Sequence, residues 1–252
     1  MRIPRTGLAS MHGRAITGAR RINILFQAGV SMMLFLLWGG ASSAKAQEIQ
    51  FGIDFTTVVP TGDFSKNVTN NGYGVGVQFL RSFGKKPLLL GVDAAFATYG
   101  SDEHTEPISA TIPELRVKVQ TNNNITLTHL VFRAQPRTGK VRPYADALVG
   151  FKYLYTNTTI LNDSSGEELA SNKNLSDLVF SYGFGGGVQV RLSRVGRSGD
   201  IALDTRVRYL RGSRADYLKE GSIRRENGSV FFDVLSSRTD VVTASIGITF
   251  RY

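Results

Sequence analysis

Few residues of this sequence have the chemistry for catalysis or metal binding. The 252 residues include three histidines and no cysteine, which excludes disulfides, thiolate metal sites and thiol nucleophiles. His104 follows Asp102 and Glu103, but three such neighbours form only a generic metal motif. His129 has no serine two residues further on with which to form a compact catalytic dyad. We therefore predict no catalytic, cofactor-binding or metal site, and no enzymatic activity.

Aspartates and arginines with a regular spacing are more informative. Arg133 and Asp146 are separated by 13 residues, and so are Arg191 and Asp204. Each pair spans one short turn between two segments of alternating polarity, so each arginine is expected to face its aspartate across a hairpin. The whole set comprises Asp54, Asp93, Asp146 and Asp204 on one group of segments, and Arg133, Arg191 and Arg251 on the other.

The segments that carry these charges alternate apolar and polar residues, which indicates β-strands with one apolar and one polar face. The clearest is Thr239–Tyr252, whose apolar set is Val242, Ala244, Ile246, Ile248, Phe250 and Tyr252. Seven segments of the same kind precede it. We predict strands at 47–59, 73–83, 88–99, 124–135, 142–155, 177–193, 200–211 and 239–252.

The connections between these strands alternate between long and short. Long polar stretches are expected at 60–72, 100–123, 156–176 and 212–238, and short turns at 84–87, 136–140 and 194–199. Within the second long stretch, residues 111–120 alternate and are expected to extend the flanking strands as a hairpin. Long loops at one end and short turns at the other are typical of outer-membrane barrels. We therefore predict an all-β fold, an eight-stranded antiparallel up-and-down transmembrane β-barrel.

Aromatic residues on the apolar faces support this interpretation, because they fall at two heights. Phe51, Phe250 and Tyr252 lie toward the turn ends of their strands. The loop ends carry Tyr73, Tyr153, Tyr155, Tyr182 and Tyr209. Two girdles of this kind mark the two interfaces of a membrane barrel. A soluble two-sheet sandwich also has many alternating strands, but its core would not sort the rings in this way.

The polar faces of such a barrel line a lumen that is just wide enough for side chains to fill. Charges in that confined space must be paired or hydrated. We therefore predict that the seven charged residues above form a belt of alternating aspartate and arginine that closes the lumen near the turn side. Arg251 is expected to reach Asp54 or Asp204. The alternative is an ion or proton pathway through the same charges.

The first 46 residues have the layout of a secretory signal peptide. Five arginines precede an apolar segment at 22–38, and Ala44-Lys45-Ala46 follows it. We predict cleavage after Ala46, which leaves 47–252 as the mature barrel. Six of the 30 basic residues and none of the 20 acidic ones lie in 1–46, so the net charge of +10 falls to +4 in the mature chain. The basic composition therefore does not indicate nucleic-acid binding.

Several of these features occur together in a known family. They are the A-x-A signal, the strand at 49–55 running into Pro60-x-Gly62-x-Phe64, the glycine-rich 182–187 and the final Ile246-Gly-Ile-x-Phe250-x-Tyr252. The chain resembles small bacterial outer-membrane β-barrel domain proteins, PorT-like and OmpA/OmpX-like in shape and of Bacteroidota type, over 47–252. The resemblance implies insertion by the barrel-assembly machinery, which would read Ile248, Phe250 and Tyr252. It marks an architecture and implies no particular activity.

Three functions are compatible with these observations. The first is an envelope-structural or interaction protein of the cell outer membrane, with a largely plugged polar lumen and four extracellular loops. The second is a narrow channel or carrier for small or lipophilic solutes, and the third is a lipid-modifying enzyme. We favour the first, with outer-membrane lipid and lipopolysaccharide as partners, and we expect a monomer without cofactors. Basic and aromatic residues in 212–238 suit an anionic sugar, a lipid phosphate or a protein, or simply a solvated loop.

Overall fold

The structure is a computed structural model that describes residues 48–82, 86–109, 112–162, 167–196, 199–219, 221–226 and 229–252. The predicted signal peptide, residues 1–46, and its cleavage after Ala46 lie outside these residues. Among the residues described, no helix is both long and apolar enough to cross a membrane.

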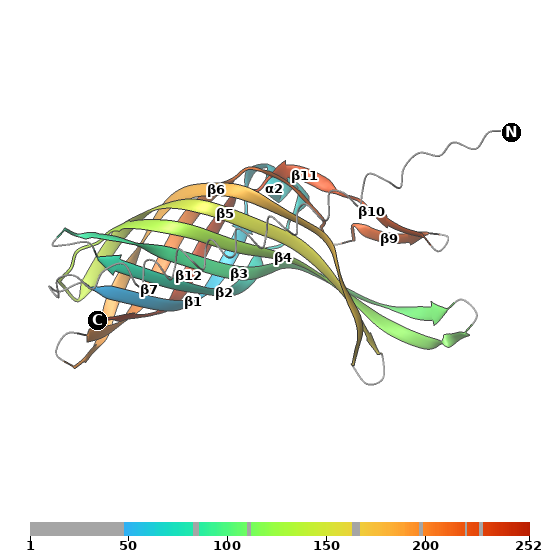
Figure 1. Ribbon diagram of the computed structural model, residues 1–252, viewed down its shortest axis with the longest axis horizontal. Helices are drawn as coiled ribbons and strands as arrows, with labels where there is room; N and C mark the ends of the chain where they lie inside the picture. Colours follow the sequence, from blue (N-terminus) through green and yellow to red (C-terminus); the bar gives the residue numbers. More distant parts are fainter. Residues whose placement is uncertain are drawn as a thin grey trace, which may run out of the picture. The chain divides into compact units, whose positions relative to one another are not determined.

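Eight of the strands in the described residues close into one barrel, in which each strand pairs with its two neighbours antiparallel (Figure 1). The order around the ring is β1-β12-β7-β6-β5-β4-β3-β2, and the first and last strands of the barrel pair from Gln50↔Arg251 to Pro60↔Val241. The predicted eight-stranded antiparallel barrel is confirmed. Its strands are β1 (Ile49–Pro60), β2 (Gly72–Ser82), β3 (Leu88–Ser109), β4 (Ile112–Ala134), β5 (Val141–Asn162), β6 (Glu168–Val195), β7 (Gly199–Gly212) and β12 (Val241–Arg251).

Four neighbouring strands continue well past the barrel on the loop side (Figure 1). β3, β4, β5 and β6 have 22, 23, 22 and 28 residues, whereas about 9–11 residues cross a membrane. The predicted hairpin within 100–123 is confirmed, since Gly100 pairs with Asn123 and the ladder runs on to Ser109↔Ile112. The polar loop predicted at 156–176 is wrong, because both strands remain paired from Asn157↔Lys173 to Leu161↔Glu168.

Two other predicted loops also contain regular structure. A short helix, α2 (Gly62–Asn67), follows β1 within 60–72 and buries Phe64. The stretch 212–238 contains two small antiparallel sheets, one of β8 (Arg214–Tyr217) with β11 (Leu235–Arg238), the other of β9 (Ile223–Glu226) with β10 (Ser229–Phe232). These stretches were predicted to be loops because most of their residues are polar or charged. The few apolar residues among them, such as Phe64, are the ones that pack.

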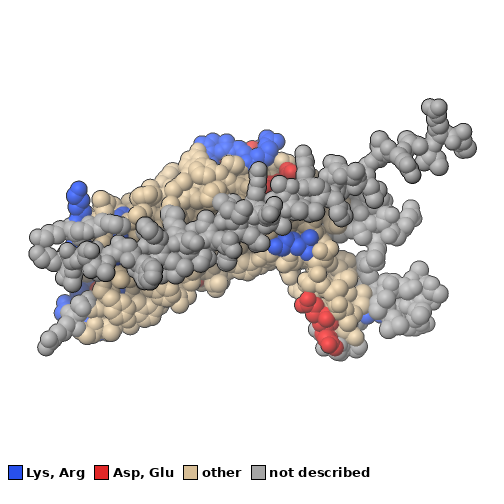
Figure 2. All heavy atoms as spheres, viewed as in Figure 1, with Lys and Arg blue, Asp and Glu red and all other residues tan. Residues whose placement is uncertain are grey.

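The barrel has its apolar residues outside and its charges inside. On β7, Val207 is 57% exposed, whereas its neighbours Arg206 and Arg208 are only 5% and 3% exposed. The same alternation holds on β6, where Phe184 is 68% exposed beside a glycine-rich inner face. In Figure 2 most of the visible described wall is uncharged, and the charged atoms form a few separate groups. This distribution is the reverse of a soluble core and suits a wall that faces hydrocarbon.

Candidate functional site

The lumen is crossed by two arginines of β7. Arg206 Nη2 lies 2.5 Å from Asp54 Oδ2 on β1 and 3.3 Å from Asp93 Oδ2 on β3. Arg208 Nη1 lies 2.9 Å from the same Asp93 oxygen, and its Nη2 lies 2.7 Å from Asp146 Oδ2 on β5. β7 and β3 stand opposite each other in the ring, four strands apart in either direction. Arg206 and Arg208 therefore span the full diameter of the lumen.

A third arginine continues this chain of charges. Arg133 on β4 donates from Nε to Asp146 Oδ1 at 2.7 Å and from Nη2 to Oδ2 at 2.9 Å, as its spacing in the sequence predicted. Its guanidinium also lies 3.5 Å from the ring centroid of Tyr144, whose hydroxyl donates to Asp204 at 2.5 Å. We call the resulting set the lumen network, and its charged members in the described residues alternate as Asp54, Arg206, Asp93, Arg208, Asp146, Arg133 and Asp204.

Two predicted members of the belt lie elsewhere. Arg191 is opposite Ala202 in the β6–β7 register, next to a bulge, and it is only half-buried. Gln189, and not Arg191, lies opposite Asp204 and donates to its Oδ2 at 3.0 Å. The predicted Arg191–Asp204 pair is therefore absent from the contacts of the described residues.

Arg251 is also placed differently from the prediction. It is level with Gln50 and Asp200 at the turn end of β12, whereas Gly247 is the residue opposite Asp54. Its guanidinium donates to Glu48 at 2.6 Å from Nε and lies 3.3 Å from Asp200. The prediction that Arg251 reaches Asp54 or Asp204 was wrong, because the residue sits about four positions nearer the turn side along the strand.

Two further layers lie between the lumen network and the turn side. Three buried glutamines form a closed ring: Gln50 donates to Gln135 at 2.8 Å, Gln135 to Gln189 at 2.9 Å, and Gln189 to Gln50 at 3.1 Å. Beyond them, Asp200 accepts two bonds from Arg142, at 2.9 and 3.0 Å, and one from Arg251. No single motif in the sequence marks these layers. They arise because inward-facing residues follow one another at every second position along the strands.

The loop side of the lumen holds fewer charges. His129 Nε2 lies 3.0 Å from Ser181 Oγ, two strands away across β5. Lys152 is fully buried and donates from Nζ to the carbonyl oxygens of Leu210, at 2.9 Å, and of Thr239. Because Ser181 in turn donates to the Arg211 carbonyl oxygen at 3.0 Å, the pair with His129 is a buried structural contact.

An aromatic cluster covers this end of the lumen, which we call the cap. Phe64 of α2 packs edge-on against Tyr217 of β8 at 5.0 Å and against Tyr99 of β3 at 5.8 Å between ring centroids. Asn67 donates to the Tyr217 hydroxyl at 2.9 Å, and all three rings are buried. Phe64 thus holds α2 over the mouth of the barrel.

Replacing Phe64 by alanine is expected to loosen the cap without unfolding the barrel. The removed ring contacts two tyrosines of other segments, and local opening costs less than global unfolding. We expect trypsin cleavage after the exposed Lys66 to become about tenfold faster or more, while the electrophoretic shift of the folded barrel remains. The lipid-facing Phe51→Ala variant is the control. Equal cleavage rates in both variants would contradict a role of Phe64 in holding α2.

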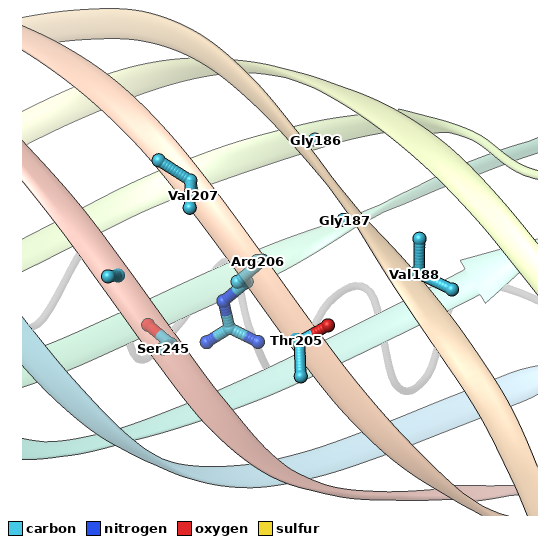
Figure 3. A pocket seen from close by; sticks show the side chains of 8 residues that line it. Gly186, Gly187, Val188, Thr205, Arg206, Val207 and Ser245 are labelled. Carbon is cyan, nitrogen blue, oxygen red and sulfur yellow. The ribbon is translucent and has the colours of Figure 1, made fainter.

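The described wall also contains a hollow of about 280 Å³ (Figure 3). Its lining comes from three neighbouring strands, β6, β7 and β12, and includes Gly187, Thr205 and Ser245. The one charged side chain there is Arg206, whose guanidinium contacts Asp54 and Asp93. In the part of the chain that the structure describes, no three histidine, cysteine or acidic side chains are close enough to hold a metal ion. His104 instead lies 3.5 Å from Asp102 on extended β3.

A closed antiparallel barrel with an apolar outside and a charged, packed inside defines a membrane-spanning β-barrel of the outer-membrane type. No family model matches the chain, and no curated protein matches it. The resemblance to PorT-like proteins of Bacteroidota type therefore stays a prediction.

Solved structures of small outer-membrane proteins are similar only at a low level. Neisserial surface protein A is 13% identical, with 83% of this chain and 98% of that chain covered and a TM-score of 0.36. The attachment protein Ail of Yersinia pestis, solved with sucrose octasulfate, is 16% identical over 82% and 97%, with a TM-score of 0.34. A major outer membrane protein of Thermus thermophilus is 11% identical over 82% and 100%, with a TM-score of 0.37. Similarity at this level carries no argument about the function of this chain.

Proposed function

We propose that the chain is an outer-membrane protein with a closed lumen, which acts as an envelope-structural or interaction protein through the parts that extend beyond the membrane. The observation that carries this proposal is the pair of arginines, Arg206 and Arg208, that crosses the lumen from β7 to β3. Transmembrane barrels of this type belong to bacterial outer membranes.

Three barriers in series argue against a channel. The aromatic cap lies at the loop side, the lumen network in the middle and the glutamine ring toward the turn side. Each network carboxylate already contacts arginine, tyrosine or amide donors, so an ion would have to displace these buried bonds. Breaking a buried, paired charge costs several kcal/mol, which is a large barrier for a conducting path.

The extended parts of β3–β6 provide the surface for interaction. Beyond the barrel these strands are joined by polar side-chain bonds, such as Thr156 to Asn123 at 2.7 Å, Thr121 with Thr158 at 3.0 Å and Asn174 to Thr158 at 2.6 Å. Hydroxyl and amide pairs across strands keep a sheet ordered without an apolar core. A polar sheet held rigidly above the membrane suits a protein partner or a surface polysaccharide better than a solute.

Assembly and lipid contact complete this proposal. Ile248 and Phe250 lie on the outward face of β12, and the exposed Tyr252 follows its last residue, where the barrel-assembly machinery and lipid would meet them. We further propose that the chain acts as a monomer and that outer-membrane lipid and lipopolysaccharide surround its wall. Nucleic acid is no partner in this proposal.

Conductance of the purified barrel in planar lipid bilayers tests the closed lumen. We expect no unitary current steps from the natural sequence, and current steps from the double variant Arg206→Ala, Arg208→Ala if that variant folds. A variant that opens only the cap, Phe64→Ala, should remain silent because the lumen network is intact. Steady channels formed by the natural sequence would overturn the proposal in favour of a narrow pore.

A further inference from the structure

Two basic side chains lie on the outer surface at the loop end of the barrel. Lys173 extends from β6 over a pair of tyrosines on β5, with its Nζ 3.0 Å from the Tyr153 hydroxyl. The same ammonium lies 5.2 Å from the ring centroid of Tyr153 and 5.0 Å from that of Tyr155. The two rings stack with their centroids 5.1 Å apart. Lys173 is exposed, so one side of its ammonium remains open to a ligand.

Three other cations of the loop side have acidic partners. Lys66 lies 2.8 Å from Asp63, Lys118 lies 2.7 Å from Glu103, and Arg238 lies 3.7 Å from Asp240. Within the described parts of the chain, Lys173 has no carboxylate partner, and the exposed Arg211 of β7 has none either. The positive charge of these two side chains is therefore not neutralised by their described neighbours.

The position of Lys173 matches the level of lipid headgroups. Just toward the turn side, Phe151 and Phe180 are exposed on the same outward face and pack edge-on at 6.1 Å. Just toward the loop side, the outer face gives way to polar residues, beginning with Asn157 opposite Lys173. Tyrosines concentrate where hydrocarbon meets headgroups, so Tyr153 and Tyr155 mark that boundary.

We propose that Lys173, Tyr153 and Tyr155 form a binding site for a phosphate group of a lipid headgroup in the outer leaflet. The ammonium supplies the charge, and the Tyr153 hydroxyl supplies a second donor beside it. Arg211 lies opposite Tyr182 in the β6–β7 register, which is further toward the turn side than Phe180, so it is not part of this site. This inference rests on the proposed function, because it requires the wall to face an outer-membrane lipid.

The test compares lipid retention by the full barrel and its variants. The protein is inserted into phosphatidylcholine vesicles with or without lipid A, then extracted and analysed by native mass spectrometry. We expect lipid A bound to the natural sequence, about tenfold less on Lys173→Gln, and near-normal binding on Lys173→Arg. Lys66→Gln is the matched control, because Lys66 is exposed on the same side but pairs with Asp63, and it should bind lipid A normally.

Two further arms make the result decisive. Lipid A without its phosphates should be retained no better by the natural sequence than by Lys173→Gln, and inorganic phosphate alone should not displace lipid A at equal concentration. Equal retention of lipid A by Lys173→Gln and the natural sequence would overturn the proposal. So would a natural sequence that retains the dephosphorylated lipid as well as it retains lipid A itself. Insertion and the absence of conductance in pure phosphatidylcholine are measured on the same samples, so failure of the proposed function is recognised separately.

Discussion

Replacing Arg208 by alanine is expected to lower the free energy of unfolding of the barrel by about 3–5 kcal/mol. The substitution removes one guanidinium that contacts two buried carboxylates, Asp93 and Asp146, at 2.9 and 2.7 Å. Asp146 retains Arg133, but among the described residues Asp93 keeps only Arg206 at 3.3 Å and Gln78 at 3.2 Å. Because removing one partner leaves charge uncompensated in a confined lumen, the loss far exceeds that of a surface ion pair. Urea unfolding of the barrel in lipid vesicles, followed by the electrophoretic shift, measures it.

Two comparisons separate this cause from simple loss of packing. Arg191→Ala removes an arginine that is half-buried and outside the lumen network, so its effect should stay within about 0.5 kcal/mol. Combining Arg208→Met with Asp93→Asn should recover much of the stability, because the unpaired carboxylate is then gone. Equal stability of Arg208→Ala and Arg191→Ala would show that the lumen network does not hold the barrel together.

Spacing in the sequence predicted one contact within a hairpin correctly, Arg133–Asp146, but failed for Arg191 and Asp204, where a bulge between Arg191 and Ser193 shifts the register. Arg133 and Asp146 are directly opposite each other in the β4–β5 register, because the short turn at 136–140 fixes which residues face one another. The contacts of Arg206 and Arg208 could not be counted in this way, since they connect β7 with strands that are not its neighbours. Ring closure and the reach of a long side chain decide those contacts. One feature of the sequence could have indicated these contacts across the lumen: Asp204, Arg206 and Arg208 are three inward-facing charges in succession on one strand.

The predictions were wrong mainly for the parts of the chain beyond the membrane, where polar composition was interpreted as loop. Residues 156–176 are polar and were expected to form a loop, but threonine has a high propensity for strands, and Thr156, Thr158 and Thr159 continue β5. The cap was unpredictable for a different reason. Phe64 is one aromatic residue in a polar stretch, and its partners Tyr99 and Tyr217 are distant in the sequence. Only the closed barrel brings the three rings together.

Replacing Gly247 by alanine is expected to destabilise the barrel by about 3 kcal/mol or more, at the upper end of the cost of overpacking. Gly247 lies on β12 between Asp54 of β1 and Asp204 of β7. A Cβ atom there would overlap the Ile53 carbonyl oxygen and come within 2.5 Å of the Asp54 Cα and Cβ. Backbone atoms cannot move aside as a flexible side chain can, so β1 would have to shift. Asp54 would then leave Arg206, and the folding yield in vesicles should fall together with the unfolding free energy.

Gly52→Ala is the matched control, because it adds the same methyl group to the same β1–β12 pairing. A Cβ at Gly52 would meet the Thr249 hydroxyl oxygen at 3.2 Å and the Ile248 carbonyl oxygen at 3.7 Å, so a small side-chain rotation makes room. We expect a loss within about 1 kcal/mol for this variant. If both alanine variants lose the same stability, the seam tolerates no added volume anywhere and the special role of Gly247 is refuted. If only Gly247→Ala fails, closure of the ring depends on how closely β12 approaches the backbone that carries Asp54.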